Sequence, residues 1–272
     1  MKSLIVIICL GLLLTNGKLN TTTDSQDDME WTLVWQDEFN YSGLPDSSMW
    51  RYDTEGNDHG WGNHEAQYYT EADQDNAWVE NGVLNITARK ENQNGKKFTS
   101  ARLVSKADWQ YGRIEVNAKL PSGRGTWSAI WMMPGGWSFN DGNWPDIGEL
   151  DIMEHVGHDL GVIHASAHSK DYQWQKQTQK TNTLHIPTVH EEFHSYSMEW
   201  TPEVLKFYVD DNLYFIYENE GLGESKWPYD KPFYLILNVA VGGAWGSLQG
   251  IDEKAFPQTM QIDYVKVYQN KI

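Results

Sequence analysis

The chain is a succession of short stretches with β-strand character, and no long segment repeats its apolar residues with the 3.6-residue period of an amphipathic helix. Residues 112–120 show this best, because polar and apolar side chains alternate from Arg113 onward, as in a strand with one buried face. Without βα alternation or an internal repeat, the sequence predicts an all-β sandwich of antiparallel sheets in one domain, residues 30–272. Further strands are expected at residues 31–35, 78–90, 128–133, 147–155, 196–200, 204–209, 213–217, 233–241 and 261–268, with hairpin tips or loops at 94–97 and 221–224.

The N-terminal residues have the pattern of a targeting signal. Lys2 precedes a nearly unbroken apolar run from Leu4 to Leu14, which is too short to span a bilayer. We therefore expect residues 1–18 to be a cleaved signal peptide and the protein to be secreted, extracellular or periplasmic; an uncleaved anchor is the alternative. The only cysteine, Cys9, lies in this run, so the mature chain should hold no disulfide. Residues 19–29 are polar and aperiodic, which predicts a flexible leader.

Charge and aromatic content restrict the partners. The formal net charge of −17 disfavours nucleic acids and sulfated polyanions, because binding them requires clustered lysine and arginine. No segment after the signal is apolar enough for a membrane helix. The 14 tryptophans and 14 tyrosines suit a neutral sugar substrate, since flat aromatic faces match the C–H faces of sugar rings. For each tryptophan, core packing is the alternative.

Three acidic residues stand close together in an apolar run, Glu149, Asp151 and Glu154. On a strand, Glu149 and Asp151 share one face, and Glu154 joins them only if a β-bulge near Ile152-Met153 adds one residue. Glutamate carboxyls about 5–5.5 Å apart are the pair of a retaining glycosidase. Neighbouring charges would raise at least one pKa and so provide an acid. A metal site, a solvated acidic strand and an amphipathic helix remain alternatives.

The run Glu149-Leu150-Asp151-Ile152-Met153-Glu154 resembles the Glu-x-Asp-x-x-Glu signature of glycoside hydrolase family 16, in its laminarinase branch. Three further segments, residues 35–39, 61–69 and 238–246, resemble the family's opening strand, its substrate loop and its late cleft loop. The resemblance implies a β-jelly roll with a concave cleft and double-displacement chemistry. It implies Glu149 as the nucleophile, Glu154 as the general acid/base and Asp151 as the residue that orients Glu149.

The same resemblance implies a set of substrate-binding residues. Trp127 and Trp131 look like a sugar-stacking pair, Trp144 lies at the entrance of the nucleophile strand, and Trp245 resembles a stacking residue on the opposite rim. His168 matches the family's histidine near the acid/base, although His164 shares its face and could be confused with it. Hydroxyl-binding roles are implied for Asn63 and Arg89.

No cofactor is expected for catalysis, but family members often hold a structural Ca²⁺ far from the cleft. The matching positions are the backbone carbonyls of Glu38 and Gly82 and the carboxylate of Asp263, and hard oxygen ligands suit this ion. The resemblance implies an endo-β-1,3-glucanase acting on a neutral β-glucan, and we take a monomer as the default oligomeric state. The alternatives are a relative acting on mixed-linkage glucan or another polysaccharide, and a non-catalytic glucan-binding protein, which would lack one or both glutamates.

Overall fold

The computed structural model describes residues 30–270, so the expected signal peptide and leader, residues 1–29, lie outside the described residues. Among these described residues, seventeen strands dominate, with only one short α-helix, α1, and three 3₁₀ helices, η1 to η3. The elements are β1 (Trp31–Asp37), β2 (Trp50–Tyr52), η1 (Asn57–Gly62), β3 (Gln67–Tyr69), β4 (Ala77–Glu80), β5 (Val83–Ala88), β6 (Phe98–Ser100), β7 (Arg102–Trp109), β8 (Gly112–Lys119), β9 (Thr126–Pro134), η2 (Phe139–Asp141), β10 (Glu149–Val156), β11 (Val162–His168), η3 (Trp174–Lys176), β12 (Lys180–His185), β13 (His194–Trp200), β14 (Val204–Val209), β15 (Asn212–Glu218), β16 (Phe233–Val241), α1 (Gly243–Gly246) and β17 (Gln258–Asn270).

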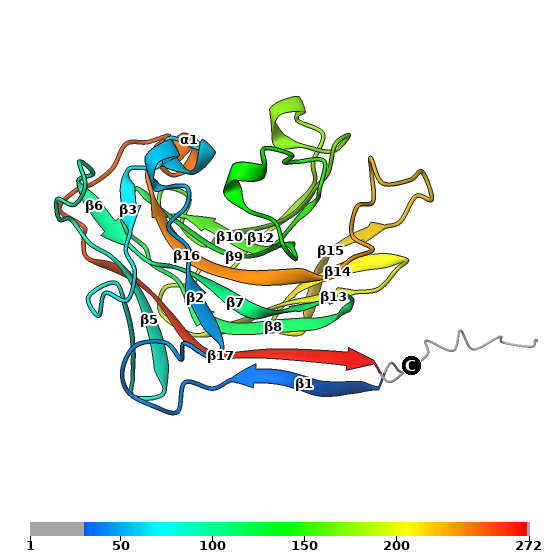
Figure 1. Cartoon of the computed structure of the whole chain (residues 1–272), viewed down its shortest axis with the longest axis horizontal. Coiled ribbons are helices and arrows are strands. Elements are labelled where there is room, and N and C mark those ends of the chain that lie inside the picture. Colours follow the sequence, from blue (N-terminus) through cyan, green and yellow to red (C-terminus); the bar gives the residue numbers. More distant parts are fainter. Residues whose placement is uncertain (1–29, 271–272) are drawn as a thin grey trace, which may run out of the picture. The chain divides into compact units, whose positions relative to one another are not determined.

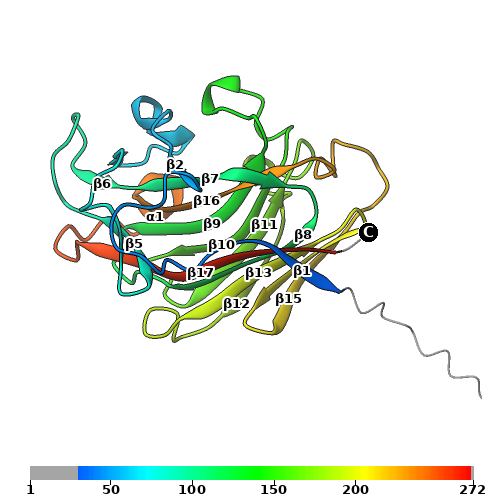
Figure 2. The ribbon, with the colours of Figure 1, turned by 60° about the horizontal axis from the view of Figure 1, so that its bottom comes forward.

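Two large antiparallel sheets form the two layers (Figures 1 and 2). The first sheet has the order β12-β11-β10-β9-β16-β7-β2, and we call it the cleft sheet. The second has the order β15-β14-β13-β8-β17-β5-β4, with β1 paired to β17, and we call it the outer sheet. A parallel pair, β3 and β6, completes the structure. The predicted all-β jelly-roll sandwich is therefore confirmed.

The core lies between the two sheets, and the burial of each strand follows from its place. In β8, buried and partly exposed residues alternate, with Ile114, Val116 and Ala118 inside. All nine residues of β16 are buried instead. One face of β16 packs in the core, while loops cover the other, and a strand covered on both faces loses its alternation.

Most predicted strands are present, but residues 78–90 are not one strand. They form β4 and β5, which pair through a turn at Asn81-Gly82 where both residues have positive φ, as a tight hairpin requires. Residues 94–97 do include a hairpin tip, closed by the pairing of Gln93 with Lys96. Six strands were not predicted, namely β2, β3, β6, β7, β11 and β12.

The predicted bulge in β10 is confirmed. Asp151 pairs with Trp131 of β9, but Met153 pairs with Ile130, so Ile152 is an additional residue. On the other side, Asp151 and Glu154 pair with residues of β11 that are only two positions apart. The extra residue returns Glu154 to the face that carries Asp151.

Three loops border this face of the cleft sheet. Residues 53–66 join β2 to β3, residues 135–148 join β9 to β10, and residues 169–179 join β11 to β12. Figure 1 shows α1 and these loops above β16, β9 and β10. Between residues 30 and 270, no helix has the length and apolar character needed to cross a bilayer.

A core substitution in the outer sheet should test this packing. Phe207 is fully buried and stacks on Phe215, with ring centroids 5.0 Å apart. We expect Phe207→Ala to lower the free energy of unfolding by about 3–5 kcal/mol, because the cavity adds to the lost transfer energy. Leu222→Ala, at a residue that is 59% exposed, should change it by less than about 0.5 kcal/mol. Urea unfolding measures both, and similar values for the two variants would contradict the assignment.

Candidate active site

Each outer glutamate of β10 accepts a hydrogen bond from its own tryptophan. The Trp144 indole Nε1 donates to Glu149 Oε2 at 2.9 Å, and the Trp127 indole Nε1 donates to Glu154 Oε1 at 2.9 Å. Trp144 comes from the loop before β10 and Trp127 from β9. Both indoles were predicted as sugar-binding surfaces, and the structure adds that they fix the direction of the two carboxyl groups.

Gly148, just before Glu149, fixes the start of the strand. Its φ is +87°, and a Cβ there would lie 2.9 Å from Pro228 Cγ and 3.2 Å from the Tyr229 ring. Only glycine meets both conditions, because other residues rarely adopt this φ and the added atom would collide. The nucleophile strand therefore begins at a position that admits no side chain.

Asp151 lies between the glutamates, almost fully buried. His168 Nε2 is 3.1 Å from Asp151 Oδ2 and 3.9 Å from Glu149 Oε1. His168 was predicted near the acid/base, but in register it stands opposite Glu149, whereas His164 stands opposite Glu154. The two histidines could not be separated by periodicity because they share one face of β11.

Burial and mutual repulsion keep protons on these carboxyls. Burial raises the pKa of Glu149 to about 8, with a further contribution from the Asp151 charge. The same two causes raise the pKa of Glu154 to about 8, and burial raises that of Asp151 to about 8. His168 lowers the pKa of both glutamates. The group therefore avoids three simultaneous charges at neutral pH, and the protons are shared among its members.

The floor of the cleft continues from β10 across β9, β16 and β7. Trp131 donates its indole N–H to Asn238 Oδ1 at 2.7 Å, and the Asn238 amide donates to the Tyr69 hydroxyl at 3.0 Å. The Arg102 guanidinium lies between two rings, 4.3 Å from the centroid of Trp61 and 4.6 Å from that of Trp131.

Arg102 lies on the cleft floor but was not singled out in the sequence, whereas Arg89 was predicted to bind substrate hydroxyls. Arg89 is not brought together with the carboxyls, since its guanidinium faces Asp75 and Glu91 at 3.6 and 3.9 Å. Arg102 is 4% exposed, and its Nε bonds to Asp53 at 3.0 Å. The available signal was an arginine next to the apolar pair Leu103-Val104 at the start of β7, because a buried charge needs a partner or a function.

The far rim is aromatic, as predicted for Trp245. Its ring meets Trp127 edge to face at 5.6 Å and His164 at 4.7 Å. Asn63 reaches the same rim, where its carbonyl accepts the N–H of Ala244. Trp245 and Asn63 therefore lie on the side of the cleft that holds Trp127 and Glu154.

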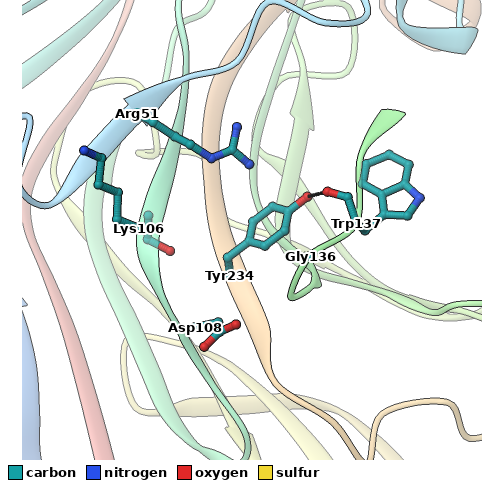
Figure 3. A pocket seen from close by; sticks show the side chains of 7 residues that line it. Arg51, Lys106, Asp108, Gly136, Trp137 and Tyr234 are labelled. Carbon is teal, nitrogen blue, oxygen red and sulfur yellow. Dashed lines mark hydrogen bonds between the residues drawn. The ribbon is translucent and has the colours of Figure 1, made fainter. Parts of the chain in front are cut away.

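A second hollow, of about 290 Å³, opens on the same face of the cleft sheet (Figure 3). Tyr234 and Trp137 line it, and the Tyr234 hydroxyl donates to the Trp137 carbonyl at 3.2 Å. Arg51, whose guanidinium carbon is 5.5 Å from the Tyr234 ring centroid, and Asp108 add opposite charges. None of the predicted site residues lines this hollow.

The residues expected to bind calcium come together elsewhere. Glu38, Gly82 and Asp263 line one cavity of about 350 Å³, with Asn40 and Asn81 supplying further oxygens. Lys266 also enters it and pairs with Glu38 at 3.1 Å. Within the cleft, ligand atoms of Glu149, Asp151 and His168 lie within 4.8 Å of one another, which is compatible with a metal ion.

The cleft geometry defines a class of enzyme. Two glutamates on one face of a bulged strand, each held by an indole, with an aspartate between them and aromatic walls around them, form the site of a glycoside hydrolase. The metal alternative leaves Glu154 and its Trp127 contact without a role.

Comparisons with known proteins agree. Residues 64–266 match the family described as glycosyl hydrolases family 16. The beta-glucanase of Rhodothermus marinus is 53% identical over 245 residues, which cover 88% of this chain and 85% of that protein. The glucan endo-1,3-beta-glucosidase of Cryptopygus antarcticus is 35% identical, over 87% of this chain and 91% of that protein. The crystal structure of the Rhodothermus marinus laminarinase superposes with a TM-score of 0.85 at 50% identity, covering 89% of this chain and 99% of that one. The chain belongs to glycoside hydrolase family 16.

The electrostatic coupling in the site predicts a shift of the pH profile. The Asp151 charge raises the pKa values of Glu154 and Glu149, so Asp151→Asn should lower both. We expect a lower kcat and an alkaline limb about one pH unit lower, because Glu154 loses its proton earlier. Asp108→Asn, on the same sheet face but outside the carboxyl row, should keep the original limb. Kinetic pH profiles decide this, and an unchanged or higher alkaline limb for Asp151→Asn would contradict it.

Proposed function

We propose that the protein is a retaining endo-β-1,3-glucanase of the laminarinase type. The observation that carries this proposal is the pairing of Glu149 with Trp144 and Glu154 with Trp127 on one face of the bulged β10. The extra residue at Ile152 gives the Glu-x-Asp-x-x-Glu spacing, which separates laminarinase-like members from those without the bulge. Relatives named beta-glucanase and glucan endo-1,3-beta-glucosidase support the same substrate class.

In this mechanism, protonated Glu154 gives its proton to the glycosidic oxygen while ionised Glu149 attacks the anomeric carbon. The leaving glucan departs with the proton, and a covalent glycosyl-enzyme remains on Glu149. Glu154, now ionised, takes a proton from water, and the hydroxide formed displaces Glu149 from the sugar. The burial that raises the pKa of Glu154 keeps the acid protonated near neutral pH.

Trp144 and His168 prepare Glu149 for the attack. The indole N–H bonds one carboxylate oxygen, and the imidazole lies 3.9 Å from the other. Both interactions favour the charged form and offset part of the rise in the pKa of Glu149 that burial causes. Asp151, held at 3.1 Å from His168, keeps the imidazole in place beside the nucleophile.

A non-catalytic glucan-binding protein is the second class that was considered. Such a protein has no need for two partly buried, indole-bonded glutamates, whose desolvation is energetically unfavourable. An enzyme for another polysaccharide, such as mixed-linkage glucan, would use the same catalytic residues. It would differ from a β-1,3-glucanase only in which glycosidic linkage the cleft walls accept. A panel of polysaccharides with reducing-end detection separates these cases.

The stereochemistry of the product tests the mechanism. With laminarin as substrate, NMR should detect the β-anomer first, because two displacements restore the configuration. Initial appearance of the α-anomer would exclude the retaining mechanism. Glu149→Ser should remove hydrolysis by several orders of magnitude and keep laminarin binding. Glu199→Gln, on the outer sheet, is the matched control and should hydrolyse laminarin normally; near-full activity of Glu149→Ser would refute the nucleophile assignment.

We also propose that the cavity around Glu38, Gly82 and Asp263 holds a structural Ca²⁺. Its oxygen-rich lining suits a hard cation, and Asp263 lies at a register shift of β17 that sets it apart from the regular pleat. Ca²⁺ should raise the Tm of the wild-type protein, since a ligand that binds only the folded state stabilises it. Asp263→Asn should lose this increase and Asp108→Asn should keep it. An equal Tm in EDTA and in Ca²⁺ would refute the site.

We propose a secreted monomer that acts on a neutral β-glucan without a catalytic cofactor. The apolar run from Leu4 to Leu14 supports secretion. The net charge of −17 favours an uncharged polysaccharide over sulfated ones.

A further inference from the structure

Glu65 is a buried carboxyl that the mechanism above does not use. It belongs to the loop of residues 53–66 and is only 8% exposed. Its backbone is fixed on several sides: its N–H donates to the Gly60 carbonyl, its carbonyl accepts Lys96 Nζ at 2.9 Å, and the residue pairs with Gly242. The side chain therefore starts from a rigid position.

The carboxyl group itself is held at one oxygen. Gln67 Nε2 donates to Glu65 Oε2 at 2.6 Å, and Gln67 cannot turn round because its Oε1 accepts the Val241 N–H at 2.7 Å. A carboxylate has about four acceptor positions; Gln67 occupies one of them, and the Asn63 side chain is a second donor to this carboxyl. The carboxyl can therefore accept further hydrogen bonds. Burying a carboxyl is energetically unfavourable, so these unused positions call for a donor.

The surroundings place this carboxyl at the wall of the cleft. A Cβ on Gly243 would lie 3.3 Å from Glu65 Cγ, 3.3 Å from the Asn63 carbonyl and 3.3 Å from the Trp127 ring. Glu65, Asn63 and Trp127 therefore meet around Gly243, and Trp127 is the residue that bonds Glu154. Glu65 is not among the groups that shift the pKa of Glu154, so it stands outside the catalytic group.

We propose that Glu65 is a specificity-determining residue that accepts a hydrogen bond from a hydroxyl group of the glucosyl residue bound beside Trp127. This inference rests on the glucanase function proposed above. A bound sugar hydroxyl supplies a donor for an unoccupied acceptor position of the carboxyl. The aromatic face of Trp127 stacks on the sugar ring, and Glu65 selects for a sugar with a hydroxyl group at the position that it can bind.

The carboxyl also titrates in the working range of pH. Burial raises the pKa of Glu65 to about 7, although Gln67, Arg102, Asn63 and Lys96 lower it in part. The folded state therefore binds this proton more tightly than the unfolded chain, so ionisation of Glu65 destabilises the fold progressively between about pH 4.5 and 7. Tyr69, the remaining titratable neighbour, stays neutral because burial and Glu65 raise its pKa.

Glu65→Gln is the informative variant because it keeps the size of the side chain and removes the charge. With laminarin at pH 8, where Glu65 is ionised, we expect KM to rise about tenfold with kcat changed less than about threefold, since a charge-assisted hydrogen bond is lost from binding. Its Tm should equal or exceed that of the wild type, with a larger gain at pH 8 than at pH 5. Glu199→Gln is the control and should leave KM unchanged.

A binding experiment separates this inference from the proposed function. In the Glu149→Ser background, calorimetry with a β-1,3-linked glucose oligomer should give about tenfold weaker affinity when Glu65→Gln is added. Hydrolysis of laminarin by the wild-type protein, with neither KM nor this affinity changed by Glu65→Gln, would overturn the inference and leave the proposed function intact. A lower Tm with unchanged KM would also overturn it, because the role would then be structural. If the wild-type protein does not hydrolyse laminarin, the proposed function itself is refuted.

Discussion

One additional residue in one strand determines the chemistry of this protein. Because side chains alternate along a strand, Glu149 and Glu154, five positions apart, would face opposite sides of the cleft sheet. Ile152 interrupts the pairing of β10 with β9 and turns Glu154 to the side of Asp151. The neighbouring strands then supply the indole of Trp127 and the imidazole of His168. The position of Glu154 beside Asp151 and Trp127 depends on that register.

Burial and charge act against each other in the cleft. The three carboxyls lie where desolvation favours their protonated forms, and the sandwich supplies indole and imidazole groups instead of full positive charges beside them. Arg102, the buried guanidinium of the floor, is bound to Asp53 and sits between Trp61 and Trp131. The positive charge of Arg102 is thereby neutralised at the cleft floor and does not act on Glu154. The three carboxyls therefore share protons and charge within one cleft, which provides both an acid and an ionisable nucleophile.

Local sequence patterns were enough to predict the sandwich, the bulge and the three carboxyls. Period-two alternation is visible in β8, and acids within the apolar run of β10 require a bulge if they are to meet. What the local patterns did not show depends on how the strands pair. Arg89 and Arg102 are both arginines near strand ends, and only the place of β7 beside β16 in the cleft sheet puts Arg102 on the floor. Likewise, only the register of β11 against β10 separates His168 from His164.

The glycine at position 148 has a consequence for how such enzymes diversify. The loop of residues 135–148 forms part of the cleft wall and ends at a residue that tolerates no side chain, packed against Pro228 and Tyr229. Substitutions and insertions earlier in that loop can remodel the wall, because the chain must always return through the same narrow point before β10. Variation in the part of the loop before Trp144, the residue that bonds Glu149, is thereby uncoupled from the placement of the attacking carboxyl. New polysaccharide preferences can arise in this scaffold while the bond-breaking step is inherited intact.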